Sequence, residues 1–130
     1  MRPSTLVSVA ERACADGSWG AAFAGFLDEF YSRNADDRWA MIAEGPPLTG
    51  DARLDALLGG VAEYLSKQYR LGRVPSWCSQ PERSLLEPWF TTAGGAGMQE
   101  YLAFSSPAEF RHRNIFTAAD PLTRARAFVP

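Results

Sequence analysis

The chain has 130 residues and a net charge of −2, with 46% hydrophobic, 12% aromatic and 22% charged residues. This is the composition of an ordinary globular protein, and it excludes coiled-coil, collagen-like and low-complexity chains. A chain of this length has room for one hydrophobic core and needs neither a disulfide nor a metal ion to fold. We therefore predict a single helical domain over residues 1–130.

Charge is distributed unevenly between the two halves of the chain. Residues 1–65 carry five arginines against ten acidic residues, and residues 66–130 carry eight basic residues against five acidic ones. A dipolar surface of this kind suits a charged protein partner better than bare nucleic acid, although solvated faces on both halves produce the same pattern.

The two cysteines, Cys14 and Cys78, belong to no metal-binding or redox motif. Isolated cysteines in a chain of this size are typical of buried thiols in a reducing compartment. The first residues lack the apolar segment of a signal peptide, and no apolar run approaches the ~20 residues that span a bilayer. We expect a cytoplasmic protein that does not enter the membrane.

Two amphipathic helices are predicted at the start of the chain. The first covers residues 5–15, with Ser4 or Thr5 as its cap, and the second covers residues 18–33, with Ser18 as its cap. Large apolar side chains recur on one face of the second helix at the period of 3.6 residues, which predicts that this face is buried.

Two further helices are predicted before the middle of the chain. The third covers residues 36–44 and ends at a Gly-Pro-Pro sequence, since neither proline can continue a helix. The fourth and longest covers residues 51–69. It contains Gly59 and Gly60, each of which lowers the stability of the helix by about 1 kcal/mol relative to alanine. Close approach of another helix would explain this glycine pair.

The second half of the chain is less regular. Prolines and glycines punctuate residues 73–97, where only a short helix over 79–86 is predicted. Helices are then predicted over residues 96–104, over 106–113, where Ser-Pro-Ala-Glu is a strong start signal, and over 117–127. No segment alternates apolar and polar residues, so we predict an all-α fold of six to seven helices with an irregular stretch near 73–97.

The residues capable of catalysis form no recognisable motif. The single histidine, His112, lies between Arg111 and Arg113, whose charges disfavour its protonation, and no carboxylate in its neighbourhood is evident to orient it. Paired carboxylates such as Asp51 and Asp55 are more typical of solvated faces or helix starts. We predict no catalytic residue, no metal site and no cofactor.

Basic and aromatic side chains alternate near the C-terminus. Arginine with aromatic residues can bind a phosphate backbone or an acidic protein surface, and the same group also occurs on plain solvated surfaces. The group consists of Phe110, Arg111, Arg113, Phe116, Arg124, Arg126 and Phe128.

Two sequences in this half carry a resemblance to a known family. Residues 86–90 read Leu-Glu-Pro-Trp-Phe, and residues 105–116 read Ser-Ser-Pro-Ala-Glu-Phe-Arg-His-Arg-Asn-Ile-Phe. This pattern resembles that of small bacterial proteins, many of them actinobacterial, which are regulatory or antitoxin partners encoded beside nucleotidyltransferase-like toxins. Some members carry a helix-turn-helix module ahead of this region, for which the ~20 residues that precede the match here are too few. Further matching elements lie at 27–31, 47–51, 75–77 and 122–125.

The resemblance implies a non-enzymatic, antitoxin-type or regulatory protein that binds a partner protein through its C-terminal segment. The alternatives are a transcriptional or nucleic-acid-binding regulator and a small enzyme with a carboxylate-based site. A structural role for the same segment is also open, in which Trp89, Phe110 and Phe116 hold the C-terminal helices together and Arg113 pairs with an acid. The residues predicted to bind the partner are Phe110, Arg111, Arg113, Asn114, Phe116, Arg124 and Arg126.

Overall fold

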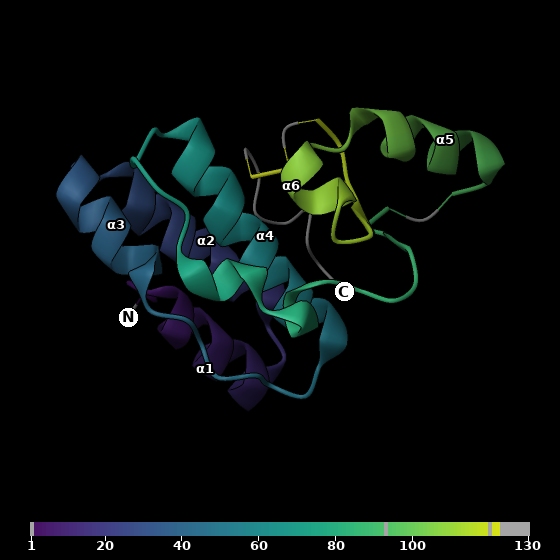
Figure 1. Cartoon of the computed structure of the whole chain (residues 1–130). Helices are drawn as coiled ribbons and strands as arrows, with labels where there is room; N and C mark the ends of the chain where they lie inside the picture. Colours follow the sequence, from purple (N-terminus) through teal and green to yellow (C-terminus); the bar gives the residue numbers. More distant parts are fainter. Residues whose placement is uncertain (1, 93, 120, 123–130) are drawn as a thin grey trace.

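A computed structural model describes residues 2–92, 94–119 and 121–122. Within these residues the protein has six α-helices, two short 3-10 helices and one sheet of two very short strands (Figure 1). The all-α prediction is confirmed. The two-stranded sheet was not predicted from the sequence, because strands of two residues are too short to show an alternating pattern.

The first two helices follow the predicted pattern closely. Helix α1 (Leu6–Asp16) begins at Thr5, whose hydroxyl oxygen accepts a hydrogen bond from a backbone N–H of the first turn, and ends at Gly17, which has a φ of 72°. Helix α2 (Trp19–Tyr31) begins after Ser18, although the Ser18 side chain makes no capping hydrogen bond. The apolar face of α2 is buried as its spacing predicts.

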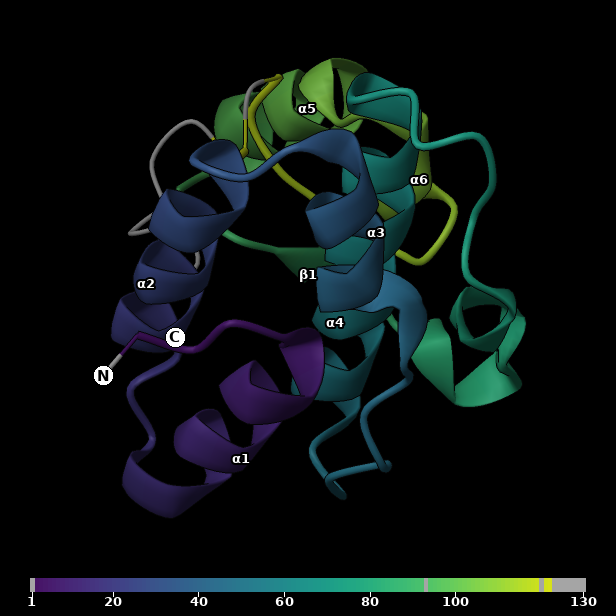
Figure 2. The same ribbon diagram turned by 90° about the vertical axis from the view of Figure 1, so that its left-hand side faces the viewer.

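Helices α3 (Ala35–Ala43) and α4 (Ala52–Gln68) also lie where they are predicted. Helix α3 begins one residue before the predicted start, and the Asn34 side chain caps it. The Asp51 carboxylate caps α4 by accepting two backbone hydrogen bonds. Most residues of α4 are buried, and α1, α2 and α3 are packed around it at one end of the molecule (Figures 1 and 2). This helix is therefore the centre of the hydrophobic core.

The glycine pair in α4 allows two other segments to approach the helix closely. A Cβ atom on Gly59 would lie 2.9 Å from Cβ of Arg83, and a Cβ atom on Gly60 would lie 2.9 Å from Cδ1 of Phe110. Arg83 belongs to a 3-10 helix over residues 81–83 and Phe110 to a short α-helix over residues 108–111, so other helices do approach the glycine pair, as the sequence predicts. The atoms nearest to the two glycines belong to the side chains of these helices.

The irregular stretch contains two 3-10 helices instead of the predicted short α-helix over 79–86. These are η1 (Ser76–Ser79) and η2 (Pro81–Arg83). The chain becomes extended at Ser84, and the N–H of Leu85 donates to the carbonyl of Arg113 (2.9 Å) rather than to a carbonyl one turn earlier. This long-range hydrogen bond ends the helical geometry.

The C-terminal lobe, defined here as residues 89–116, consists of β1 (Trp89–Phe90), α5 (Ala96–Ser105), α6 (Ala108–Arg111) and β2 (Ile115–Phe116). The strands pair in parallel, with Trp89 opposite Ile115 and Phe90 opposite Phe116. In Figure 1 α5 lies at the opposite end of the molecule from α3.

Three predictions for the C-terminal helices are corrected. Ser106 does not cap α6, because its hydroxyl bonds to the carbonyl of Leu102 and to the backbone of Thr117. Helix α6 ends at Arg111 and not at residue 113, and Asn114 follows in the left-handed conformation with a φ of 66°. Of the predicted helix over 117–127, residues 117–119, 121 and 122 are not helical and the remainder lies outside the described residues.

Candidate partner-binding surface

The structure separates the seven residues predicted to bind a partner. Phe110 and Arg113 are buried, with 0% and 3% of their surface exposed. Arg111 is exposed, and Asn114 and Phe116 are partly buried. The two remaining residues, Arg124 and Arg126, lie outside the described residues.

The Arg113 side chain joins three parts of the chain. Its Nη1 atom donates to the carbonyl oxygens of Cys78 (3.0 Å) and Arg83 (3.1 Å), and its Nη2 atom donates to Oε1 of Glu63 (2.8 Å). Its Nε atom has no hydrogen-bond partner within the described part of the chain. These contacts tie the C-terminal lobe to α4 and to the 3-10 helices, which corresponds to the structural role that the sequence left open.

Glu63 is the centre of a charged cluster. Its carboxylate contacts Nζ of Lys67 (2.9 Å) and Nε2 of His112 (2.8 Å) in addition to Arg113. Burial alone would raise the pKa of Glu63, but hydrogen bonds from Lys67 and His112 and the charge of Arg113 outweigh it, so the pKa lies below its ordinary value. His112 thus has a carboxylate partner, which the sequence could not show because Glu63 lies 49 residues away.

A cavity of about 330 Å³ opens beside this cluster, lined in part by Cys78, Ser79 and Ser84. Burial raises the pKa of the Cys78 thiol to about 12, so the thiol is protonated at neutral pH and is a weak nucleophile. The lowered pKa of Glu63 keeps this carboxylate ionised and hydrogen-bonded. The cluster therefore has the properties of a structural ion-pair network, in which the acid is an acceptor rather than a proton donor.

Asn114 and Phe116 hold the strand pair in place. The side-chain amide of Asn114 donates to the backbone carbonyl of Leu85 (2.8 Å), and the backbone carbonyl of Asn114 accepts from the N–H of Trp89 (2.8 Å). The ring of Phe116 stacks on that of Phe90, with 5.0 Å between the ring centroids. Both residues of the predicted interface thus take part in the internal packing of the lobe.

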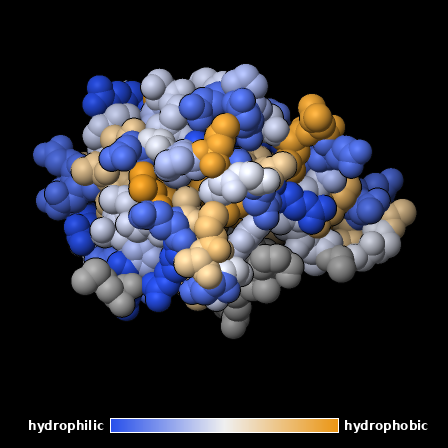
Figure 3. Space-filling view, turned by 90° about the horizontal axis from the view of Figure 1, so that it is seen from below, coloured by the Kyte–Doolittle hydropathy of each residue, from blue (hydrophilic) through white to orange (hydrophobic). Residues whose placement is uncertain are grey.

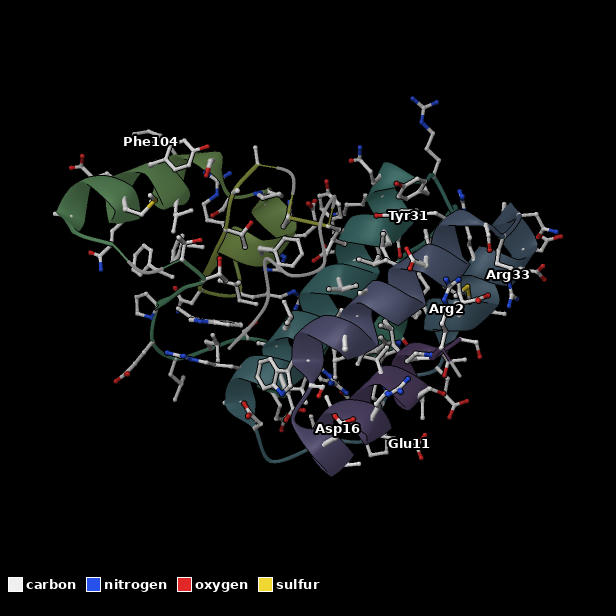
Figure 4. The ribbon with its side chains drawn as sticks, turned by 180° about the vertical axis from the view of Figure 1, so that it is seen from behind. Arg2, Glu11, Asp16, Tyr31, Arg33 and Phe104 are labelled. Carbon is white, nitrogen blue, oxygen red and sulfur yellow. The ribbon has the colours of Figure 1, made fainter. Side chains whose placement is uncertain are left out.

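Helix α5 exposes apolar side chains that were not among the predicted site residues. Met98, Tyr101 and Phe104 are 38%, 57% and 84% exposed, and Leu102 is the one buried residue of the helix. Figure 4 shows Phe104 on the outer side of α5, far from the charged residues labelled near α1–α3. The spacing of three residues, which places these side chains on one helix face, was the signal available in the sequence.

Contacts with β2 and with Thr117 hold α5 in place, although most of the helix is exposed. The Ser105 hydroxyl donates to the carbonyl of Thr117 (2.9 Å), and α5 packs against β2. An exposed apolar face on an ordered helix marks an interaction surface more often than a single exposed apolar residue does.

Most of the surface seen in Figure 3 is hydrophilic, and hydrophobic side chains gather at a few places on it. Across residues 2–92, 94–119 and 121–122, no group of three or more His, Cys, Asp or Glu side chains is arranged to hold a metal ion. None of the helices in these ranges has the length and apolar character needed to cross a membrane. Comparison with protein-family models, curated proteins and solved structures finds no match to this chain.

Proposed function

We propose that this chain is a non-enzymatic, cytoplasmic binding protein of the antitoxin type. In this proposal the outer face of the C-terminal lobe binds a nucleotidyltransferase-like partner protein. The class of partner follows from the resemblance carried by residues 86–90 and 105–116. The observation that supports binding is the face of α5 formed by Met98, Tyr101 and Phe104, of which Phe104 is 84% exposed.

Burial of this face by a partner would be favourable. Full burial of one large apolar side chain contributes about 1.5–3 kcal/mol, and aromatic residues, methionine and arginine are the types enriched in protein interfaces. Arg111, on α6 of the same lobe, is exposed and forms no ion pair with another described residue. It supplies a cation that can pair with an acidic group of the partner.

The buried residues of the predicted segment have a supporting role in this proposal. The ring of Phe110 packs against Gly60 of α4, and Arg113 holds the lobe against the same helix through its contact with Glu63. The buried residues Phe110 and Arg113 then position α5 and leave Arg111 exposed, and they themselves form no direct contact with the partner.

The test begins with a tagged pull-down from the native host at moderate salt, followed by mass spectrometry and purification of the retained protein. Calorimetry then compares the wild type with the double variant Tyr101→Ser/Phe104→Ser. We expect one stoichiometric nucleotidyltransferase-like protein, and a loss of affinity of about a hundredfold, about 2.8 kcal/mol, in the variant.

Val74→Ser is the matched control, because Val74 is a 37% exposed apolar residue outside the lobe. This control is expected to bind as the wild type does. Retention of nothing, or of nuclease-sensitive material alone, would contradict the proposal. Equal affinity of the Tyr101→Ser/Phe104→Ser variant would remove α5 from the interface.

A further inference from the structure

An apolar groove of about 760 Å³ lies on a different part of the surface from the face of α5. One side is formed by the connection before α4 and the first turn of α4, and the other by residues 81–88. Leu86 is completely exposed and Leu48 is 47% exposed. The apolar side chains that line the groove are Leu48, Ala52, Pro81, Leu85, Leu86 and Pro88.

The two sides of the groove are held at a defined separation. The buried Arg83 side chain donates through Nη2 to the carbonyl of Pro46 (2.6 Å) and through Nη1 to the carbonyl of Asp55 (3.4 Å). The Asp55 carboxylate in turn accepts from the backbone N–H and the hydroxyl of Thr49 (2.9 and 2.8 Å). A groove fixed in this way loses little conformational freedom when it binds a ligand, which favours affinity.

The charges at the rim indicate the kind of ligand. Glu82 and Glu87 are exposed, and neither forms an ion pair with another described residue. The basic residue of the lining, Arg53, lies over the ring of Trp89, with 5.2 Å from its Cζ atom to the ring centroid. Exposed carboxylates beside an apolar surface repel phosphate groups and attract lysine or arginine. This favours a basic protein segment over nucleic acid.

We infer that this groove binds a short segment of the partner protein that carries large apolar side chains together with lysine or arginine. The apolar side chains pack against Leu48, Leu85 and Leu86, and the cation pairs with Glu82 or Glu87. This inference rests on the proposed function, since it assigns the segment to the same partner. The groove shares no residue with α5, so the partner contacts the protein at two separate places.

The groove can be tested without the partner. A phage-displayed library of random dodecapeptides is panned against the full chain, and the enriched peptides are synthesised and titrated by fluorescence anisotropy. We expect enrichment of peptides with apolar residues next to lysine or arginine. Leu86→Ser, and separately Glu82→Gln/Glu87→Gln, are expected to raise the Kd of these peptides at least about tenfold.

Two controls keep the result interpretable. Leu86 is fully exposed, so Leu86→Ser is expected to leave the thermal unfolding midpoint unchanged by circular dichroism. Tyr101→Ser/Phe104→Ser is expected to leave peptide affinity unchanged, because these residues lie outside the groove. Loss of the partner in the α5 variant together with no peptide binding would therefore leave the proposed function standing and the groove rejected.

The inference is overturned if no peptide is enriched, if the enriched peptides are acidic, or if they bind the Leu86→Ser variant as tightly as the wild type. It is also overturned if analytical ultracentrifugation shows a dimer that Leu86→Ser converts to a monomer, since the groove would then hold a second copy of this chain.

Discussion

Arg83 and Arg113 are buried almost completely, with 1% and 3% of their surface exposed. Arg113 has a carboxylate partner, whereas the guanidinium of Arg83 donates to carbonyl oxygens and to the side chain of Gln80 and lies over the ring of Trp77. The sequence marked Arg113 as part of a specific motif, but it could not distinguish an interface from a structural contact. That distinction depends on Glu63, which is 50 residues away in the chain.

Removal of the Arg113 side chain is expected to destabilise the protein strongly. Arg113→Ala leaves two buried carbonyl groups without their donor and removes one of the three partners of the Glu63 carboxylate, which keeps Lys67 and His112. Loss of one member of a buried ion pair costs about 3–5 kcal/mol, and we expect a destabilisation toward the lower end of that range. Urea unfolding measures the change. Arg111→Ala, at the exposed last residue of α6, is expected to change stability by less than about 0.5 kcal/mol. Similar effects of the two substitutions would contradict the assigned roles.

The ionised Glu63 is expected to stabilise the protein in a pH-dependent way. Its pKa in the folded state lies below the ordinary value of 4.5, so its contribution is present above that pH and is lost as the pH falls through the folded-state pKa. Unfolding free energies measured from neutral pH down to pH 3 should fall less steeply for Glu63→Gln than for the wild type. Glu100→Gln, an exposed position on α5, should leave the slope unchanged.

At the scale of elements, helices α1 to α4 were predictable because their signals are local. Thr5 and Asp51 cap their helices as expected, and the apolar stripes are buried as their periods require. The elements of residues 73–97 and of the lobe were predicted less well. Their geometry is set by hydrogen bonds to distant residues, such as that of Leu85 to Arg113, which no local pattern contains.

A glycine-to-alanine substitution tests the packing against α4, and a second one in α5 is its control. In Gly60→Ala the new Cβ atom would lie 2.9 Å from the ring of Phe110. Overpacking of a core costs about 1–3 kcal/mol, whereas the gain in helix propensity is about 1 kcal/mol. We therefore expect net destabilisation by about 1 kcal/mol in thermal unfolding.

Gly97→Ala is the matched variant in α5. Apart from its chain neighbours and the backbone of its own helix, no heavy atom of the described residues lies within 4 Å of the position of the added Cβ. We expect this variant to be as stable as the wild type or more stable, by up to about 1 kcal/mol. Stabilisation by Gly60→Ala would show that Phe110 moves aside easily and that the contact is not tight.

At the scale of the whole molecule, the fold class followed from composition and helical periodicity, and the arrangement of the lobe did not. The exposed face of α5 illustrates the difference. Its spacing of three residues is visible in the sequence, but whether that face meets the core or solvent depends on where β2 and Thr117 hold the helix. The candidate site therefore required the structure.

The two cysteines report on opening of the whole molecule. Cys14 is exposed on α1, and Cys78 is buried with its pKa raised to about 12. With a thiol reagent at about pH 8 we expect one equivalent to react rapidly, and the second at a rate limited by opening of the structure. Cys14→Ser should remove the rapid phase alone. Two rapid equivalents in the wild type would contradict the burial of Cys78.

The parallel pairing of β1 with β2 has a consequence for synthesis of the protein on the ribosome. Helices α1 to α4 are complete early, but Trp89 and Phe90 remain unpaired until Ile115 and Phe116 have been made, since a parallel partner must return from further along the chain. Phe110 and Arg113, which contact the glycine pair of α4, are also made only shortly before these two residues. The nascent chain thus carries an open apolar surface on its central helix from the completion of α4 at Gln68 until Phe110 has been made, and this surface is where we expect chaperones to bind and premature association to begin.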